Sequence, residues 1–428
     1  MAKRPGTGAA PKAARQSNFE LLRILAMLMV VASHWGWWSH AYPNALQDST
    51  QYWFHFYFRT FGQVGVVLFV LISGYFMCKN QFKILSLIRL MAQIFCIILF
   101  LLGFHYLRTY IATGAFPTMT FTELTDWFIP VSKTRWWFVT CYVALFLLSP
   151  FLNKMIERLK KNEFRLLLGI LLAFLSVFPS FFVYSKDNGL LHNLALFFLF
   201  YLIGAYIRLY QEDFQSKALC FGGAAVALAL YMACRRFEFM EMRYALSVIT
   251  LSVFLFLAFM HIRIQSKWIN LCAATTFGVF LLHENTFVRF WLWNDVFAIQ
   301  TYANTGWFIP VSILSVVLTF LGGAVIDYLR QITVEPLILK GCRTPKVSRW
   351  LAAIDGAMPK NGVTAEEGTK PSPAPGLVLL CAAALYFGCK VVQVYTQIEI
   401  AFKLFLVIAV VAAVVMVLRH KWAEKKNT

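Results

Sequence analysis

Charged side chains are scarce in this chain of 428 residues, at 14% of the sequence against about 25% in an average globular protein. Acidic residues are the scarcest, with 20 Asp and Glu against 39 Lys and Arg. Apolar residues reach 60%, and Phe alone occupies 42 positions. This composition excludes a soluble enzyme, a nucleic-acid-binding protein and a disordered scaffold as descriptions of the whole chain. It indicates an integral membrane protein whose surroundings are the lipid bilayer.

Cysteine patterns typical of a metal site or a disulfide framework are also missing. The chain has nine Cys residues but no C-x-x-C or C-x-x-x-H spacing. Most of them lie inside apolar runs, where cysteine behaves as a small buried apolar residue. We therefore expect neither a bound metal ion nor a set of disulfides.

Long apolar runs, in contrast, follow one another along most of the chain. Each is near or above the roughly 17–20 residues that a helix needs to cross a bilayer. The first ten lie at about 19–38, 62–78, 84–106, 136–153, 165–183, 190–210, 218–234, 243–261, 268–290 and 307–329, and two more lie at about 376–393 and 399–418. The sequence predicts an all-α multi-pass membrane protein with a bundle of about ten transmembrane helices plus a C-terminal two-helix hairpin.

These runs divide the chain into five predicted parts. A basic arm at 1–17 is expected to be disordered, and it differs from a cleaved signal peptide because the apolar run that follows is too long. The membrane domain occupies 18–330. A linker at 331–375 carries six prolines among charged residues. The appended hairpin at 376–418 and a tail at 419–428 complete the chain.

The distribution of basic residues predicts the orientation in the membrane. With the N-terminus inside, 28 of the 39 Lys and Arg lie in or beside cytoplasmic segments and 11 on the outer side. Cytoplasmic loops of membrane proteins retain Lys and Arg. We therefore expect a protein of the inner or plasma membrane with both termini in the cytoplasm.

The first apolar run contains three ionisable residues, Glu20, Arg23 and His34. Arg23 and His34 are 11 residues apart, which places both on one face of a helix, about 16 Å from each other along its axis. Glu20 precedes Arg23 by three residues and can pair with its guanidinium group. Ionisable groups inside a span are costly and are functional candidates by default. The structural alternatives are an arginine that reaches the headgroups and a histidine at the membrane interface.

Four segments in register resemble the acyltransferase 3 family of bacterial membrane proteins. They are Arg23 with ten intervening residues and then His34, GQVGVVLFVLISGY at 62–75, WFVTCY at 137–142, and TFGVFLLH at 276–283. The resemblance covers about residues 18–330. The chain departs from the family pattern at Val70, where a second Phe is common, and at Glu284, which follows His283.

The resemblance implies an enzyme that transfers an acyl group other than an amino-acyl group. The usual donor is cytoplasmic acetyl-CoA, which serves as cosubstrate. The usual acceptor is a hydroxyl of a cell-surface polysaccharide or of a lipid-linked sugar, so the expected reaction is O-acetylation.

The resemblance also suggests roles for individual residues. His34 and His283 are the expected catalytic residues, with His34 acting either as a base or as an acyl carrier. Both lie about 15 residues from the cytoplasmic start of their helices, so we expect them at one depth. Arg23, oriented by Glu20, together with Arg89 or Lys83, is expected to bind the phosphates of the donor.

Three other interpretations stay open from the sequence. Ser73 can hydrogen-bond the donor, or it can have a structural role only, while Gly62, Gly65 and Gly74 are interpreted as small residues that permit close helix packing. Trp136 and Trp137 can form an aromatic belt or a platform for a sugar. A transporter or flippase of a glycan or an anionic lipid would also place Arg and His within the membrane.

Overall fold

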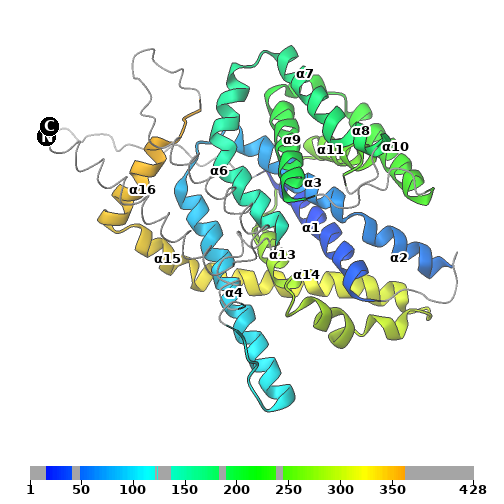
Figure 1. Ribbon diagram of the computed structural model, residues 1–428. Helices are drawn as coiled ribbons and strands as arrows, with labels where there is room; N and C mark the ends of the chain where they lie inside the picture. The colour runs from blue at the N-terminus through cyan, green and yellow to red at the C-terminus, as the bar shows by residue number, and fades with distance from the viewer. Residues whose placement is uncertain are drawn as a thin grey trace, which may run out of the picture. The chain divides into compact units, whose positions relative to one another are not determined.

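The computed structural model describes residues 16–40, 49–120, 123, 136–182, 189–237 and 244–361, and every regular element in these ranges is helical (Figure 1). The expected all-α membrane fold is therefore confirmed for this part of the chain. The helices are α1 (Ser17–Trp38), α2 (Thr50–Thr60), α3 (Gly62–Met77), α4 (Ile84–Thr113), α6 (Trp137–Arg158), α7 (Lys161–Leu172), α8 (Phe178–Phe182), α9 (Leu190–Leu209), α10 (Lys217–Arg236), α11 (Leu246–Met260), α12 (Lys267–Ala273), α13 (Thr276–His283), α14 (Phe308–Thr333), α15 (Glu335–Cys342) and α16 (Pro345–Ala357). Most of the predicted arm at 1–17, the hairpin at 376–418 and the tail at 419–428 lie outside the described residues.

Eight helical stretches within the described residues are long and apolar enough to cross a bilayer. They are Ser17–Trp38, Thr50–Met77, Ile84–Thr113, Trp137–Arg158, Lys161–Ser180, Leu190–Leu209, Lys217–Arg236 and Phe308–Cys342. The expected number of about ten is not confirmed. One reason is that α11 has only 15 residues.

The other difference is that the run predicted at 268–290 is not one helix. It is divided between α12 and α13 at Ala274 and Thr275. The hydroxyl of Thr275 donates to the carbonyl of Cys272 at 2.7 Å, and that of Thr276 donates to the carbonyl of Ala273 at 2.9 Å. Such side-chain bonds to nearby carbonyls compete with the regular helical ladder.

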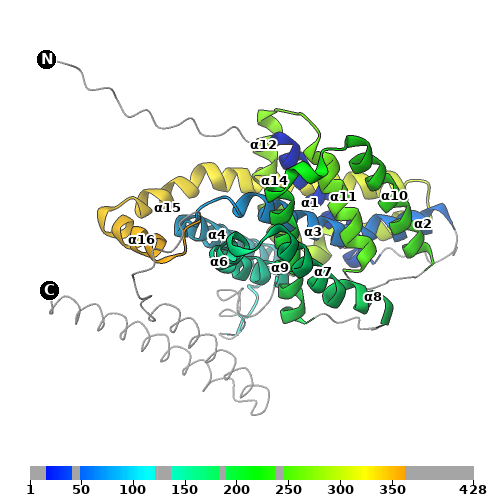
Figure 2. The ribbon, with the colours of Figure 1, turned by 90° about the horizontal axis from the view of Figure 1, so that it is seen from above.

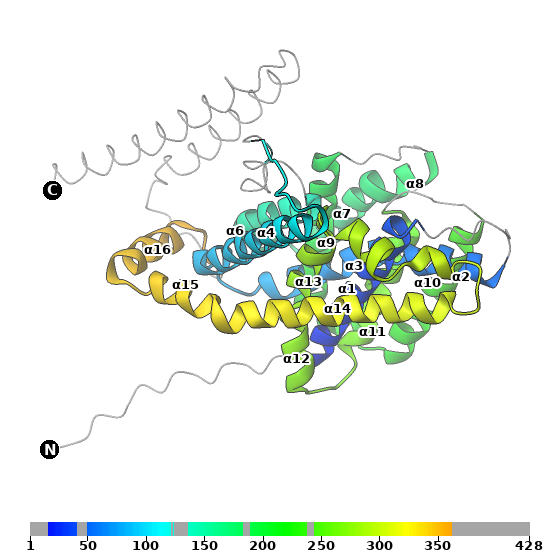
Figure 3. The same ribbon diagram turned by 90° about the horizontal axis from the view of Figure 1, so that it is seen from below.

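Close contacts between helices place α1 and α3 at the centre of the bundle. A Cβ atom at Gly65 would collide with the backbone carbonyl of Ala26 on α1, and one at Gly74 would collide with the backbone of Tyr201 on α9. The interpretation of these glycines as residues for close packing is thus confirmed. Figures 2 and 3 show α1 and α3 enclosed by α9, α11 and α14. The side chains between them form one apolar core in which Leu22, Val31 and Trp35 of α1 are fully buried.

Residues 331–361, the part of the predicted linker that the structure describes, are largely helical. The helix α14 continues to Thr333, and α15 and α16 follow with only short turns between them. All described residues belong to one compact unit, Met1–Gly362.

Candidate active site

The two expected catalytic histidines lie in contact. His34 is on the last turns of α1, and His283 is the last residue of α13. The Nδ1 atom of His34 lies 2.8 Å from the Nε2 atom of His283, although the residues are 249 positions apart. His283 is almost fully buried, whereas the His34 side chain is 21% exposed.

The hydrogen bonds assign the protons of this pair. His283 Nδ1 lies 2.6 Å from the carbonyl oxygen of Val279, which can only accept, so Nδ1 of His283 carries the proton. In the neutral imidazole of His283, Nε2 is then an acceptor. Nδ1 of His34 must therefore donate to it. In a neutral His34 the lone pair consequently lies on Nε2.

Glu284 is the third member of the cluster. Its Oε2 atom lies 3.1 Å from His34 Nδ1 and accepts a 3.0 Å hydrogen bond from the indole of Trp38. Its Oε1 atom accepts from Arg289 at 3.5 Å. Trp38 and Arg289 both donate to it, which suits an ionised carboxylate. The single Nδ1–H of His34 is directed at His283, with the carboxylate of Glu284 beside it, and the lone pair on the opposite nitrogen, Nε2, is the one that can act as a base.

His34 and Glu284 line a cavity of about 450 Å³. Trp37, Trp38 and Trp136 contribute aromatic surface to its wall. The other lining residues are Val30, Ser33, Gly62, Gln63, Val66, Trp137, Phe138, Tyr244, Phe280 and Arg289. We call this cavity the histidine pocket. On the predicted topology it lies toward the outer end of α1. Trp136 and Trp137 thus line a cavity that can hold a ligand.

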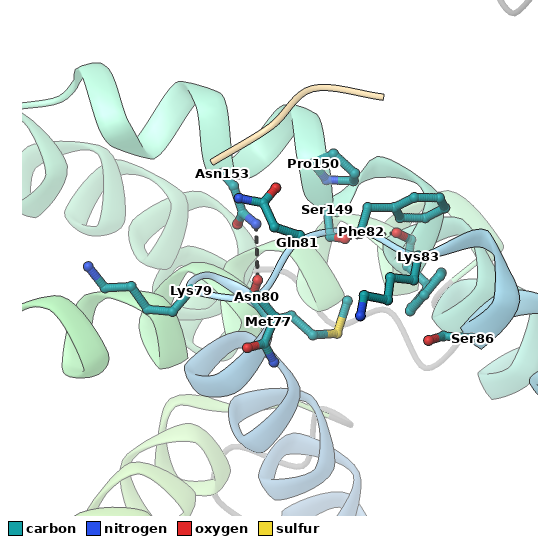
Figure 4. A pocket seen from close by; sticks show the side chains of 11 residues that line it. Met77, Lys79, Asn80, Gln81, Phe82, Lys83, Ser86, Ser149, Pro150 and Asn153 are labelled. Atoms are coloured by element: carbon teal, nitrogen blue, oxygen red, sulfur yellow. Dashed lines mark hydrogen bonds between the residues drawn. The ribbon is translucent and has the colours of Figure 1, made fainter. Parts of the chain in front are cut away.

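The histidine pocket lies at the N-terminal ends of α3 and α6. A second cavity, of about 530 Å³, lies toward the C-terminal ends of the same two helices (Figure 4). It is lined by the segment Lys79–Lys83 between α3 and α4 and by Met77, Ser86, Phe146, Ser149, Pro150 and Asn153. Figure 4 shows the ammonium group of Lys83 among these side chains, while Lys79 points away from them. We call this cavity the lysine pocket. It lies on the predicted cytoplasmic side.

The helices α3 and α6 contribute to both cavities. On α6, Phe138 lines the histidine pocket and Ser149 the lysine pocket. These residues are about 16 Å apart along a helix of 1.5 Å rise per residue. Between them Tyr142 stacks on Phe138, and its hydroxyl lies 3.4 Å from Ser73 Oγ. Ser73 also donates to the carbonyl of Phe69 at 2.9 Å.

The expected donor-binding residues are not brought together in one place. Arg23 forms the predicted pair with Glu20, at 2.6 Å, and neither residue is among those that line the lysine pocket or the histidine pocket. Arg89 lies on α4, with its Nε atom 3.8 Å from Glu335. Ser73 lies between the two cavities.

The cluster of His34, His283 and Glu284 is the group within the described residues whose ligand atoms could hold a metal ion, since these atoms all lie within 4.8 Å of one another. Two nitrogens that bind one tetrahedral zinc at about 2.0–2.1 Å are separated by roughly 3.3 Å. The histidine nitrogens are only 2.8 Å apart, which is a hydrogen-bonding distance. In this arrangement His34 and His283 are joined by a hydrogen bond, and Glu284 lies 3.1 Å from His34.

Comparison with known proteins identifies one family. The model of the family described as "Acyltransferase domain" matches residues 16–324, which is more than half of the chain and includes His34, His283 and Glu284. Searches of curated proteins and of solved structures gave no match.

Proposed function

Because the chain belongs to this acyltransferase family and is a membrane protein, we propose that it is an O-acyltransferase. The proposed reaction moves an acyl group, acetyl in the simplest case, from cytoplasmic acetyl-CoA to a hydroxyl of a cell-surface or lipid-linked glycan. The observation that carries the proposal is the geometry of His34, whose Nδ1–H faces Glu284 and His283 inside a cavity large enough for a sugar.

In the proposed mechanism, His34 acts as the base through Nε2. This atom takes the proton of the acceptor hydroxyl as the oxygen attacks the thioester carbonyl. The carbon–sulfur bond then breaks, and the leaving thiolate takes up the proton that His34 removed from the hydroxyl, which returns His34 to its neutral form. Glu284, 3.1 Å from Nδ1, stabilises the imidazolium form that exists during the transfer. A covalent acyl-His34 intermediate is the alternative chemistry, and it needs the same lone pair.

The histidine pocket suits the acceptor. The apolar faces of sugar rings pack on aromatic side chains, and Trp37, Trp38 and Trp136 provide such surfaces beside His34. Arg289 and Gln63 line the same cavity and can bond to hydroxyl groups.

The lysine pocket suits the donor. Lys83, whose ammonium group lies among the lining side chains, supplies positive charge for phosphate groups on the predicted cytoplasmic side. The thioester arm would then pass Ser73 and Tyr142 toward His34, along the line of contacts described above. Arg23 is proposed as a further cation for the donor near the start of α1.

The alternative of a transporter has one supporting observation, because the divided span α12–α13 carries His283 and broken helices often form substrate sites in transporters. Membership of an acyltransferase family favours the enzyme.

The decisive experiment combines two measurements on cells with and without the protein. Mass spectrometry of the surface glycans should reveal an acetyl increment that depends on the wild-type protein. The variant His34→Ala, present at the same membrane level, should lose transfer by at least roughly 10²-fold because the base is gone. Normal acetylation by His34→Ala would refute the mechanism, and an unchanged glycan mass together with altered glycan export would favour the transporter.

A further inference from the structure

The segment that follows the family-matched region packs against the start of α4. Asp355 of α16 accepts a 2.7 Å hydrogen bond from the backbone N–H of Ile84. Asn361 exchanges two hydrogen bonds of 3.1 Å with Gln81, and its side chain donates to the carbonyl of Asn80 at 2.9 Å. Residues beyond the family-matched range therefore fix the loop that lines the lysine pocket.

This packing forms a further, open cavity of about 430 Å³ between α4, α15 and α16. Three cations line it, Lys83, Arg89 and Arg343, against the single carboxylate of Asp355. The other lining residues are Leu85, Leu339, Cys342, Ser348, Leu351 and Ala352. We call it the arginine pocket.

The cations of this pocket are poorly neutralised. In the part of the chain that the structure describes, Lys83 and Arg343 have no carboxylate within 4 Å. Arg89 is 3.8 Å from Glu335, beyond hydrogen-bonding distance. Asp355 already accepts the N–H of Ile84. An excess of positive charge thus converges on a concave space.

The general preference for Lys and Arg in cytoplasmic loops explains the presence of cations here. It does not explain their convergence. Lys83, Arg89 and Arg343 are exposed, as is Lys346 on α16, but of these four cations only the first three line one concave surface. Lys83 also lines the lysine pocket, so the two cavities adjoin at this side chain.

We propose that the arginine pocket binds phosphate groups through Lys83, Arg89 and Arg343. If the phosphates are those of the acyl donor, this inference rests on the proposed function. A phospholipid headgroup carries the same chemistry and is the other source. The segment 335–361 is then a phosphate-binding attachment to the acyltransferase domain.

The test uses the full chain in nanodiscs of zwitterionic phosphatidylcholine, with CoA as the probe and its affinity as the readout. Arg343→Glu should weaken the binding of CoA by at least tenfold, because it replaces a charge-assisted contact by repulsion. The matched control is Lys346→Glu, the same charge change on the same segment but outside the pocket lining, and it should stay within about twofold. Pantetheine, which lacks the nucleotide phosphates, should bind equally to wild type and Arg343→Glu.

A second arm distinguishes the sources of phosphate. If a lipid headgroup is bound, Arg343→Glu leaves the affinity for CoA unchanged but abolishes the preference of the protein for nanodiscs that contain phosphatidylglycerol. Equal effects of Arg343→Glu and Lys346→Glu in both arms, or no effect of either, would overturn the proposal. Failure of the proposed function is separate, since it would appear as wild-type protein that neither binds CoA nor transfers acetyl groups.

Discussion

The contact between Glu284 and His34 makes a sharp prediction for the variant Glu284→Gln. The change keeps the shape of the side chain and, with the amide oxygen in the place of Oε2, the bond from Trp38. It loses the 3.5 Å bond from Arg289 and removes the negative charge 3.1 Å from His34 Nδ1. That charge attracts His34 most strongly when the imidazole is protonated, which in the proposed mechanism happens during the transfer. The interaction therefore acts on the transition state, and its loss should lower kcat with little change in KM.

The structure also sets the size of the effect. Unit charges 3.1 Å apart attract by about 5 kcal/mol at an effective dielectric constant near 20, and Arg289 on the other carboxylate oxygen reduces this value. A charge-assisted hydrogen bond contributes at least about 1.5 kcal/mol. Turnover should therefore fall between roughly 10-fold and 10³-fold.

The assay is the transfer of labelled acetyl groups from acetyl-CoA to extracted glycans by purified protein. Glu284→Asp should restore part of the rate. Glu157→Gln is the matched control, since it removes a carboxylate from an ion pair of 2.9 Å on the surface of α6, and exposed pairs of this kind contribute little. Wild-type kcat in Glu284→Gln, or a change confined to KM, would show that Glu284 does not stabilise a charged His34.

Three further predictions concern the donor, a metal and the C-terminal region. Arg23→Ala should weaken donor affinity by roughly 10–150-fold, with partial recovery in Arg23→Lys, and a lower membrane level with normal activity per molecule would instead indicate an anchoring role. Incubation with a chelator, followed by measurement of acetyl transfer, should leave the rate unchanged, and recovery of a lost rate by added zinc would assign the cluster of His34, His283 and Glu284 to a metal. A chain ending after Gly362 should retain transfer activity, because the family-matched region ends at residue 324 and the predicted hairpin at 376–418 follows a separate linker; loss of activity at a normal membrane level would show that the hairpin completes the site.

The sequence predicted those contacts that follow from regular helices. The spacing of three residues paired Glu20 with Arg23, and the structure has this pair at 2.6 Å. Counting residues from the membrane surface placed His34 and His283 at one depth, and the structure brings them together. In both cases the rise and rotation per residue carried the information.

Contacts that depend on irregular structure were missed. Glu284 stood in the sequence only as a departure from the family pattern, although an ionisable residue at the end of an apolar run is itself a signal. The division between α12 and α13 carries no proline or glycine at Ala274 or Thr275 that would predict it. The division is supported by a contact that the sequence does not reveal, since Gln331 of α14 donates to the carbonyl of Ala274 at 3.1 Å.

That division explains how the catalytic pair is held. A helix of eight residues such as α13 has little stability of its own, so its position depends on the helices packed against it. Asp327 of α14 is fully buried, and its carboxylate accepts hydrogen bonds from Gln93 of α4, at 3.0 Å, and from Arg330 and Gln331, at 2.7 and 2.8 Å.

The same carboxylate lies directly against α13. A Cβ atom at Gly278 would collide with the side chain of Asp327, so only glycine lets the two helices meet at this point. Because a buried carboxylate is expensive unless all its bonds are made, the network around Asp327 tolerates few displacements. His283 lies five residues beyond Gly278, and its bond to His34 therefore depends on a buried network that touches neither histidine. The position of His283 is thus fixed by α4 and α14. Through its bond to His283, the proposed base His34 on α1 is held in place by these two helices.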